Sequence, residues 1–260
     1  MQTTLPHLIP GSDRQQENSP QFVSHEHEKD PRRKLIVALD VGTAAAAGKI
    51  VAAVGESAFT YKVGMQLYTA EGPQFVRDLV ESGRRVFLDL KYHDIPNTVA
   101  AAVHEAARLG VSMLTVHASG SETMVRAAVD AARAVNPVLI VLGVTVLTSL
   151  DENDLQKIGI QSAVQDEVLR LSALALANGC GGIVASAREA SRLRSELGHD
   201  FAIVTPGVRL AGEGHADQVR VVTPAEAIAA GASHIVVGRP ITEAADPAAE
   251  ARAILAQIGS

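Results

Sequence analysis

Short apolar segments alternate with alanine-rich segments of helical spacing from residue 34 onward. Each apolar segment ends in a polar or glycine-containing turn, a pattern typical of buried strands. The predicted strands are residues 35–39, 59–63, 85–90, 113–116, 138–146, 182–185, 201–204 and 234–237. The segments between them have the apolar spacing and helix propensity of an outer helical layer, as in residues 99–109, 122–134, 167–177 and 225–229.

The number of these strands indicates the fold class. Eight strand–helix units in a chain of 260 residues predict an α/β protein folded as a closed (β/α)8 TIM barrel, which commonly has roughly 250 residues. An open, doubly wound sheet is the competing architecture, but it usually has fewer strands and often a Gly-rich first turn. The first turn here, Leu39-Asp-Val-Gly-Thr43, is not a GxGxxG motif, so the barrel is favoured.

Residues 1–33 lack any strand or helix period. They contain Pro10, Pro20 and Pro31, a His25-Glu-His-Glu-Lys-Asp run and few apolar groups. Such composition is typical of a mobile terminus, so we predict a flexible tail over 1–33 and a single catalytic barrel domain over 34–260.

Charge and hydropathy narrow the possible partners. The chain has 23 basic and 29 acidic side chains, for a net charge of −6, which disfavours nucleic acid as a partner but allows small anions. The longest apolar stretch, residues 138–147, is interrupted by Gly143 and Thr145 and is shorter than the roughly 20 residues that span a bilayer. We therefore predict no membrane partner.

The single cysteine, Cys180, cannot form an internal disulfide, and the N-terminus lacks a secretory pattern. A reducing, cytoplasmic location is the prediction. No sequence feature near Cys180 would activate a thiolate, so we interpret it as a small buried apolar residue.

Polar residues lie where the predicted strands end, which is where barrel enzymes carry their chemistry. In strand order these residues are Asp40, Lys62, Asp89 with Lys91, His117, Thr145 with Thr148, Ser186, Arg209, and Gly238 with Arg239.

The ends of the last two strands indicate a phosphate site. Barrels often bind phosphate with these loops and the start of a short helix. Gly207 and Gly238 allow close backbone approach, and Arg209 and Arg239 supply charged donors. The alternative is that the glycines only form tight turns and the arginines are solvated.

The segment Asp89-Leu-Lys-Tyr-His-Asp-Ile-Pro-Asn-Thr98 is the densest chemical feature. Residues two apart on a strand point the same way, so Asp89 and Lys91 are expected to face the barrel mouth together. Lys62 and Asp94 complete an alternating set of charges, which tolerate desolvation better together than singly. The alternative is an ion-pair network that only closes the barrel top.

The loop after this strand is predicted to be ordered. Pro96 disfavours helical geometry at Ile95, and Asn97 or Thr98 is expected to cap a helix that begins near Val99.

Other catalytic motifs are absent from the sequence, including GxSxG, HExxH, GxxxxGK[ST] and paired cysteines. A metal held by Asp89 and Asp94 is conceivable, but Lys62 and Lys91 would compete for those carboxylates. We predict no metal, and we interpret His93 and His117 either as packing residues or as residues that support the reacting groups from behind.

These residues resemble the conserved blocks of the orotidine 5'-phosphate decarboxylase family, in its bacterial form. Besides the segment ending at Thr98, the similar blocks are Leu39-Asp40, Tyr61-Lys62-Val-Gly64, Leu147-Thr148-Ser149, Thr205-Pro-Gly-Val-Arg209, Asp217-Gln218 and Val237-Gly-Arg-Pro240. They occur in the family's order over about residues 34–245. The resemblance implies a (β/α)8 barrel that converts orotidine 5'-monophosphate to UMP and CO2 in pyrimidine biosynthesis without a cofactor.

The resemblance also implies a role for each matching residue. Lys91 would be the proton donor to C6, Asp89 would lie against the scissile carboxylate, and Lys62 would hold both in the charged array while contacting the ribose. The other implied roles are ribose binding by Asp40, binding of the base or phosphate region by Thr148 and Gln218, and phosphate binding by Arg209, Gly238 and Arg239. A homodimer is implied as well, with Asp94, Ile95 and Thr98 reaching the neighbouring active site. Residues 209–218 would be a lid.

Two alternatives to this function stay open at this point. One is a metal-dependent decarboxylase or aldolase of the same barrel group, which shares Asp-x-Lys-x-x-Asp but needs a carboxylate where Lys62 stands. The other is a catalytically silent nucleotide-phosphate binder, against which the intact charged set argues.

Overall fold

Eight parallel strands close into a barrel in the computed structural model, which describes residues 30–209 and 222–259. Each strand pairs with the next in the sequence, and β8 pairs with β1. The strands are β1 (Leu35–Ala38), β2 (Thr60–Gly64), β3 (Arg85–Tyr92), β4 (Met113–His117), β5 (Ile140–Val144), β6 (Gly182–Val184), β7 (Ala202–Thr205) and β8 (His234–Val237). The predicted barrel is confirmed.

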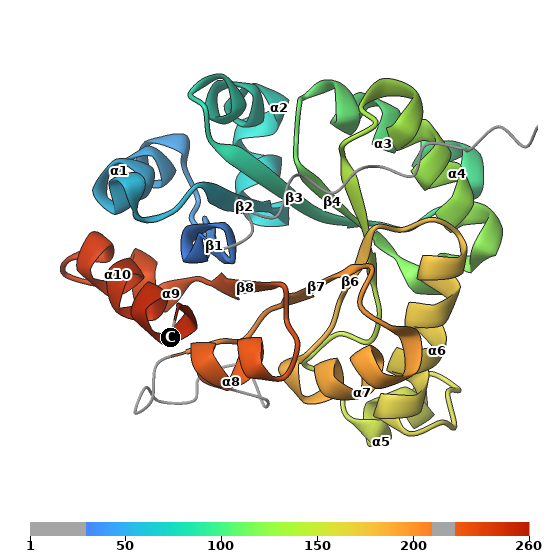
Figure 1. Ribbon diagram of the computed structural model, residues 1–260. Helices are drawn as coiled ribbons and strands as arrows, with labels where there is room; N and C mark the ends of the chain where they lie inside the picture. Colours follow the sequence, from blue (N-terminus) through green and yellow to red (C-terminus); the bar gives the residue numbers. More distant parts are fainter. Residues whose placement is uncertain (1–29, 210–221, 260) are drawn as a thin grey trace, which may run out of the picture.

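Helices cover the outside of the barrel, and the first and last units lie side by side where it closes (Figure 1). The α-helices are α1 (Ala44–Val54), α2 (Met65–Glu81), α3 (Pro96–Arg108), α4 (Ser121–Val135), α5 (Glu152–Lys157), α6 (Val164–Ala177), α7 (Ala187–Leu197), α8 (Pro224–Ala229), α9 (Arg239–Thr242) and α10 (Pro247–Ile258). Short 3-10 turns are η1 (Pro31–Arg33), η2 (Gly55–Ser57) and η3 (Ala118–Gly120).

Two apolar layers stabilise this arrangement. Leu35 and Val37 of β1 belong to the larger cluster between the strands and the helices, whereas Ile36 belongs to a smaller cluster with Phe87 and Met113. The division follows from the two-residue period of a strand, which sends alternate side chains to opposite faces. The smaller cluster fills the barrel interior, so apolar side chains pack directly below the polar residues at the strand ends.

Most predicted boundaries differ from the structure by one to three residues, and three of the differences have a clear physical reason. Strand β5 begins at Ile140 instead of 138, because Val138 lies in a turn after α4 and its side chain is 81% exposed. Helix α3 begins at Pro96, and neither Asn97 nor Thr98 caps it, since both lie in its first turn. Proline is favoured at a first helical position because its ring presets φ and no N–H is required there.

The third difference concerns the end of the predicted tail. Residues 31–33 form η1, where the Asp30 carboxylate accepts a hydrogen bond from Arg32 N at 3.0 Å and Arg32 lies over the Phe59 ring. The chain is therefore attached to the barrel from residue 30. The remainder of the predicted tail, residues 1–29, lies outside the described residues.

Two further expectations concern the chain as a whole. Within the described ranges, no helix combines the length and apolar character needed to span a membrane. Cys180 is buried, and burial raises the pKa of its thiol to about 12. This agrees with its interpretation as a packing residue.

Candidate active site

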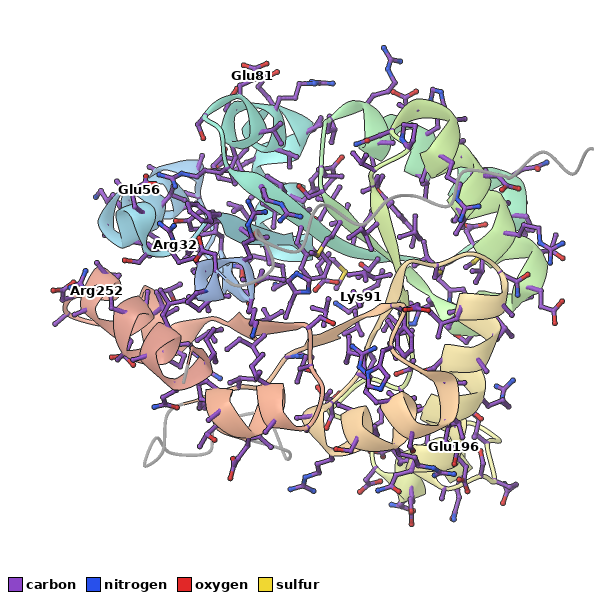
Figure 2. All side chains as sticks on the ribbon, in the orientation of Figure 1. Arg32, Glu56, Glu81, Lys91, Glu196 and Arg252 are labelled. Atoms are coloured by element: carbon purple, nitrogen blue, oxygen red, sulfur yellow. The ribbon has the colours of Figure 1, made fainter. Side chains whose placement is uncertain are left out.

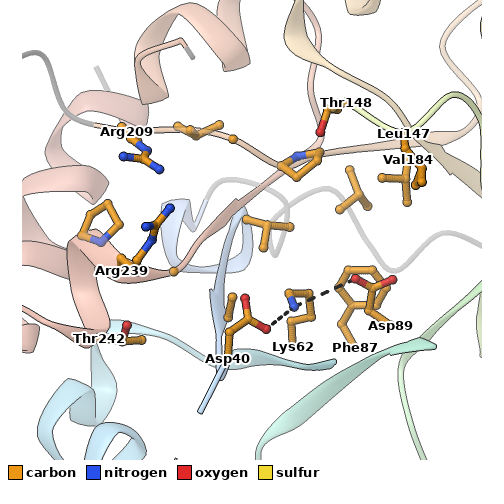
Figure 3. A pocket seen from close by; sticks show the side chains of 18 of the residues that line it. Asp40, Lys62, Phe87, Asp89, Leu147, Thr148, Val184, Arg209, Arg239 and Thr242 are labelled. Atoms are coloured by element: carbon orange, nitrogen blue, oxygen red, sulfur yellow. Dashed lines mark hydrogen bonds and ion pairs between the residues drawn. The ribbon is translucent and has the colours of Figure 1, made fainter. Parts of the chain in front are cut away.

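A cavity of about 490 Å³ opens at the carboxyl ends of the strands. Residues from the ends of β1, β2, β3, β5, β6, β7 and β8 line it (Figure 3). Most of the predicted site residues are among them, namely Asp40, Lys62, Asp89, Lys91, Thr148, Arg209, Gly238 and Arg239. The sequence expectation that chemistry gathers at this end of the barrel agrees with this placement.

Alternating charges form a continuous row along one wall of the cavity. Lys62 Nζ lies 2.7 Å from Asp40 Oδ1 and 4.0 Å from Asp89 Oδ2. Lys91 Nζ donates to both oxygens of Asp89, at 2.8 and 2.9 Å. The Lys62 and Asp89 side chains are only 11% and 14% exposed, so their opposite charges interact through little water.

The pairing of neighbouring strands produces this row. Ala38 of β1 is in register with Lys62 of β2, and Gly64 of β2 is in register with Asp89 of β3. The Leu39 N–H donates to the Lys62 carbonyl at 2.9 Å, which extends the β1–β2 contact to the residue before Asp40. Three adjacent strands therefore deliver their terminal polar side chains to one place.

Asp89 and Lys91 meet as predicted, but not through a regular strand. The β3–β4 register shifts between Leu88 and Tyr92, and Lys91 has a φ of 51°. The alternation of side chains along a regular strand therefore does not by itself explain why Asp89 and Lys91 lie close together. Lys91 has a left-handed φ, which few non-glycine residues adopt, within the stretch where the register shifts. This irregular backbone directs the Lys91 ammonium toward the Asp89 carboxylate.

Thr115 of β4 also contacts this pair, and the sequence argument did not select it. Its hydroxyl accepts a hydrogen bond from Lys91 N at 2.9 Å and donates to Asp89 Oδ1 at 3.0 Å. The available signal was a single hydroxyl in the apolar run Met113-Leu-Thr-Val, two residues before His117. A buried polar group in such a run needs a partner.

Two arginines lie on the side of the cavity away from Asp89. Figure 3 shows the guanidinium groups of Arg209 and Arg239 directed into the same space as Lys62. Gly207 has a φ of 78°, which a residue with a side chain rarely adopts, and Gly238 immediately precedes α9. The charged row thus lies at one end of the cavity and the two arginines at the other, and Glu243 also lines the cavity.

Several predicted site residues lie elsewhere. Asp94, Ile95 and Thr98 are exposed and do not line the cavity. The Asp94 carboxylate accepts a hydrogen bond from Ile95 N at 2.6 Å. Gln218 and the predicted lid after Arg209 lie outside the described residues.

The histidines near the row pack against each other. The ring centroids of His93 and His117 are 5.3 Å apart. Burial lowers the pKa of His117, and the neighbouring His93 and Lys91 lower it further. The described residues contain no group of three or more His, Cys, Asp or Glu side chains placed to hold a metal ion.

The fold and the site together define a (β/α)8-barrel enzyme with paired carboxylate and ammonium groups at the mouth of the barrel. The family model described as orotidine 5'-phosphate decarboxylase / HUMPS family matches residues 33–254. The chain belongs to this family.

Individual relatives agree with that assignment. Orotidine 5'-phosphate decarboxylase of Moorella thermoacetica is 51% identical over 238 residues, covering 89% of this chain and 93% of the relative. The protein of the same name from Vibrio cholerae is 52% identical over 217 residues, covering 82% and 93%. The crystal structure of orotidine 5'-phosphate decarboxylase from Lactobacillus acidophilus superposes with a TM-score of 0.80 at 37% identity, covering 88% of this chain and all of that one.

Proposed function

We propose that this chain is a carboxy-lyase that converts orotidine 5'-monophosphate to UMP and CO2 in pyrimidine biosynthesis. The observation that carries the proposal is the Lys91–Asp89 ion pair, flanked by Lys62, in the same cavity as Arg209 and Arg239. Family membership and the names of the relatives point to the same reaction.

The charges of the row suit the loss of CO2. Breaking the bond to the carboxylate leaves a carbanion at C6 with little resonance stabilisation, so electrostatic stabilisation must lower the barrier. In our proposal Asp89 lies beside the departing carboxylate, and the Lys91 ammonium faces C6 and donates the proton that completes UMP. The Asp89–Lys91 contact supports this, because it holds a carboxylate anion within one hydrogen bond of the ammonium that donates the proton.

Lys62 and Asp40 serve the ribose end of the row. Lys62 Nζ lies between two carboxylates, so it keeps Asp89 from facing uncompensated negative charge when the anionic substrate enters. Asp40, whose side chain is 58% exposed, has accessible oxygens for the ribose hydroxyls.

The cationic end of the cavity binds the phosphate. Arg209 and Arg239 provide forked donors that match phosphate geometry, and Gly238 allows the backbone to approach closely. Thr148, which lines the same cavity after β5, and Gln218 contact the base or phosphate region. Binding energy from this remote group fixes the base against Lys91.

A homodimer completes the site in this proposal. Asp94, Ile95 and Thr98 are exposed on the single chain, and the Ile95 side chain is 67% exposed. Their exposure at the end of the strand that carries Asp89 supports a position at an interface, where they would reach the partner's site. The proposed setting is the cytoplasm.

The reaction proceeds without a cofactor in this proposal. Lys62 and Lys91 already contact the carboxylates of Asp40 and Asp89, so the positions that a divalent cation would need are taken by ammonium groups. A metal-dependent relative would need a carboxylate at position 62.

The test is decarboxylation of orotidine 5'-monophosphate, followed by loss of its ultraviolet absorbance, with EDTA present. Wild-type protein is compared with Lys91→Ala and with Lys49→Ala, which removes an exposed lysine from α1. We expect turnover in the wild type and in Lys49→Ala, and its loss in Lys91→Ala.

Other outcomes would reject the proposal. No turnover by wild-type protein that binds UMP tightly would support a silent nucleotide binder. Activity on a sugar phosphate that appears only with magnesium would assign the chain to the metal-dependent group.

A further inference from the structure

We propose that Thr115 is a positioning residue that fixes Asp89 and Lys91 in their reactive arrangement. The inference rests on the proposed function and deepens it, because Thr115 does not line the cavity and acts through the two residues that do. Its side chain is fully buried on β4, beneath the charged row.

The Thr115 hydroxyl joins two different parts of β3. It accepts a hydrogen bond from the Lys91 backbone N–H at 2.9 Å and lies 3.0 Å from Asp89 Oδ1. A hydroxyl has one hydrogen to donate. Because the Thr115 oxygen accepts from the Lys91 amide, its own hydrogen can point to Asp89. The two hydrogen bonds therefore run from the Lys91 N–H through the Thr115 hydroxyl to the Asp89 carboxylate.

The backbone of β3 explains why this contact is needed. Phe87 and Leu88 pair in register with Met113 and Leu114, but Tyr92, not Leu90, pairs with Val116. The residues between are therefore bulged opposite Thr115, and the Lys91 amide finds its acceptor in a side chain instead of the strand ladder.

This bulge holds Lys91 in an unfavourable backbone conformation. Its φ of 51° lies in the left-handed region, which is unfavourable for a residue with a Cβ. Such a conformation persists when surrounding contacts hold it. The Thr115 hydroxyl is one of these contacts, and the Lys91–Asp89 ion pair is another.

The hydroxyl also limits rotation of the Asp89 carboxylate. Oδ1 accepts hydrogen bonds from Lys91 Nζ and from the Thr115 hydroxyl. Oδ2 accepts a hydrogen bond from Lys91 Nζ and lies 4.0 Å from Lys62 Nζ. Without the hydroxyl, both the carboxylate and the Lys91 backbone gain freedom. Misplacement of reacting groups by about 1 Å can cost roughly a hundredfold in rate.

The experiment compares Thr115→Val, which removes the hydroxyl at nearly constant volume, with Thr115→Ser, which keeps it. Thr60→Val is the matched control, because Thr60 is a fully buried threonine on β2 whose Oγ1 makes no hydrogen bond within the described residues. We expect Thr115→Val to lower kcat roughly 10- to 100-fold with KM and the Kd for UMP within about threefold of wild type. Thr115→Ser should keep at least about a third of kcat, and Thr60→Val should keep nearly all of it.

A second readout does not depend on turnover. Hydrogen exchange at the Lys91 amide should be faster in Thr115→Val than in wild type and Thr115→Ser, with melting temperatures measured alongside. A kcat within twofold of wild type in Thr115→Val, equal losses in the valine and serine variants, or unchanged Lys91 exchange would each overturn the proposal. Lack of wild-type turnover with faster Lys91 exchange in Thr115→Val would instead reject the proposed function and retain the positioning contact.

Discussion

The nearly buried ammonium of Lys62 lies 2.7 Å from Oδ1 of the half-exposed Asp40. The same ammonium is 4.0 Å from Asp89, so Lys62 links a solvated carboxylate to a buried one. This link predicts that Lys62 is needed for the reaction more than for folding. If Lys62 is lost, water can solvate the Asp40 carboxylate, and Asp89 still has its ion pair with Lys91.

Replacing Lys62 by methionine tests this link. We expect kcat/KM for orotidine 5'-monophosphate to fall roughly 10²- to 10³-fold, the usual loss when one preorganised charge or donor is removed, with little change in melting temperature. Steady-state kinetics and a thermal melt measure the two effects. A variant with kcat/KM within threefold of wild type would show that the row does not depend on Lys62.

Gly64 makes room for this lysine. A Cβ at Gly64 would lie 3.1 Å from Lys62 Nζ and 3.2 Å from Asp40 Oδ1. The backbone there, with φ −92° and ψ −179°, is one that alanine adopts. We therefore expect Gly64→Ala to fold normally but to displace the ammonium by a few tenths of an ångström, lowering kcat/KM roughly three- to tenfold.

The control for that change is Gly48→Ala in α1. Nothing lies within 4 Å of a Cβ at Gly48, and alanine in a helix interior is favoured over glycine by roughly 0.5–1 kcal/mol. Gly48→Ala should therefore unfold at higher denaturant concentration with unchanged kinetics. Equal activities of the two variants would mean that the contact at Gly64 does not matter.

Arg239 is predicted to bind the phosphate. Loss of a hydrogen bond to a charged group costs roughly 1.5–3 kcal/mol, so Arg239→Ala should weaken UMP binding about 10- to 100-fold, as measured by calorimetry. Arg252→Ala on the peripheral helix α10 (Figure 2) is the control, because Arg252 is exposed and far from Lys91 at the barrel centre. Unchanged binding and kcat/KM in Arg239→Ala would rule out this assignment.

The sequence predicted the fold because strand and helix periods are local properties. Eight apolar runs sufficed to predict the barrel, and the rule that chemistry lies at strand ends placed Asp40, Lys62 and Arg239 in one cavity. The errors lie at element ends, such as the start of α3 at Pro96, where turn geometry competes with propensity.

The sequence did not reveal that Thr115 holds Asp89 and Lys91 in place, because this depends on tertiary contacts between two strands. Thr115 is 24 residues from Lys91 along the chain, and their contact depends on the register between β3 and β4. The left-handed φ of Lys91 has the same origin. A pattern read along one strand assumes regular geometry and cannot contain a bulge that the neighbouring strand stabilises.

His234 is predicted to make stability depend on pH. Its Nδ1 is buried without a hydrogen bond in the described part of the chain, and burial, aided by Arg85, lowers the pKa of His234 from 6.5 to about 4. Between these values the unfolded chain binds a proton that the folded chain does not, so stability is full above pH 6.5 and falls as pH drops toward 4. The loss is on the order of 3 kcal/mol.

Denaturant unfolding at pH 7 and pH 4.5 measures this dependence. The difference in unfolding free energy between the two pH values should shrink in His234→Gln. It should be unchanged in His199→Gln, which alters an exposed histidine. If His234→Gln keeps the full wild-type difference, another group is responsible for it.

The exposed position of Asp94 predicts complementation between two inactive variants. If Asp94 completes the partner's site, Lys91→Ala and Asp94→Ala homodimers are both impaired, since every site lacks one of the two groups. A hybrid dimer has one site with the intact Lys91 of one subunit and the intact Asp94 of the other. Random exchange makes half of the dimers hybrids with one complete site of two, so mixing should restore roughly a quarter of wild-type activity. Activity that stays at the sum of the separate variants, with subunit exchange verified by mass spectrometry, would place Asp94 in its own chain's site.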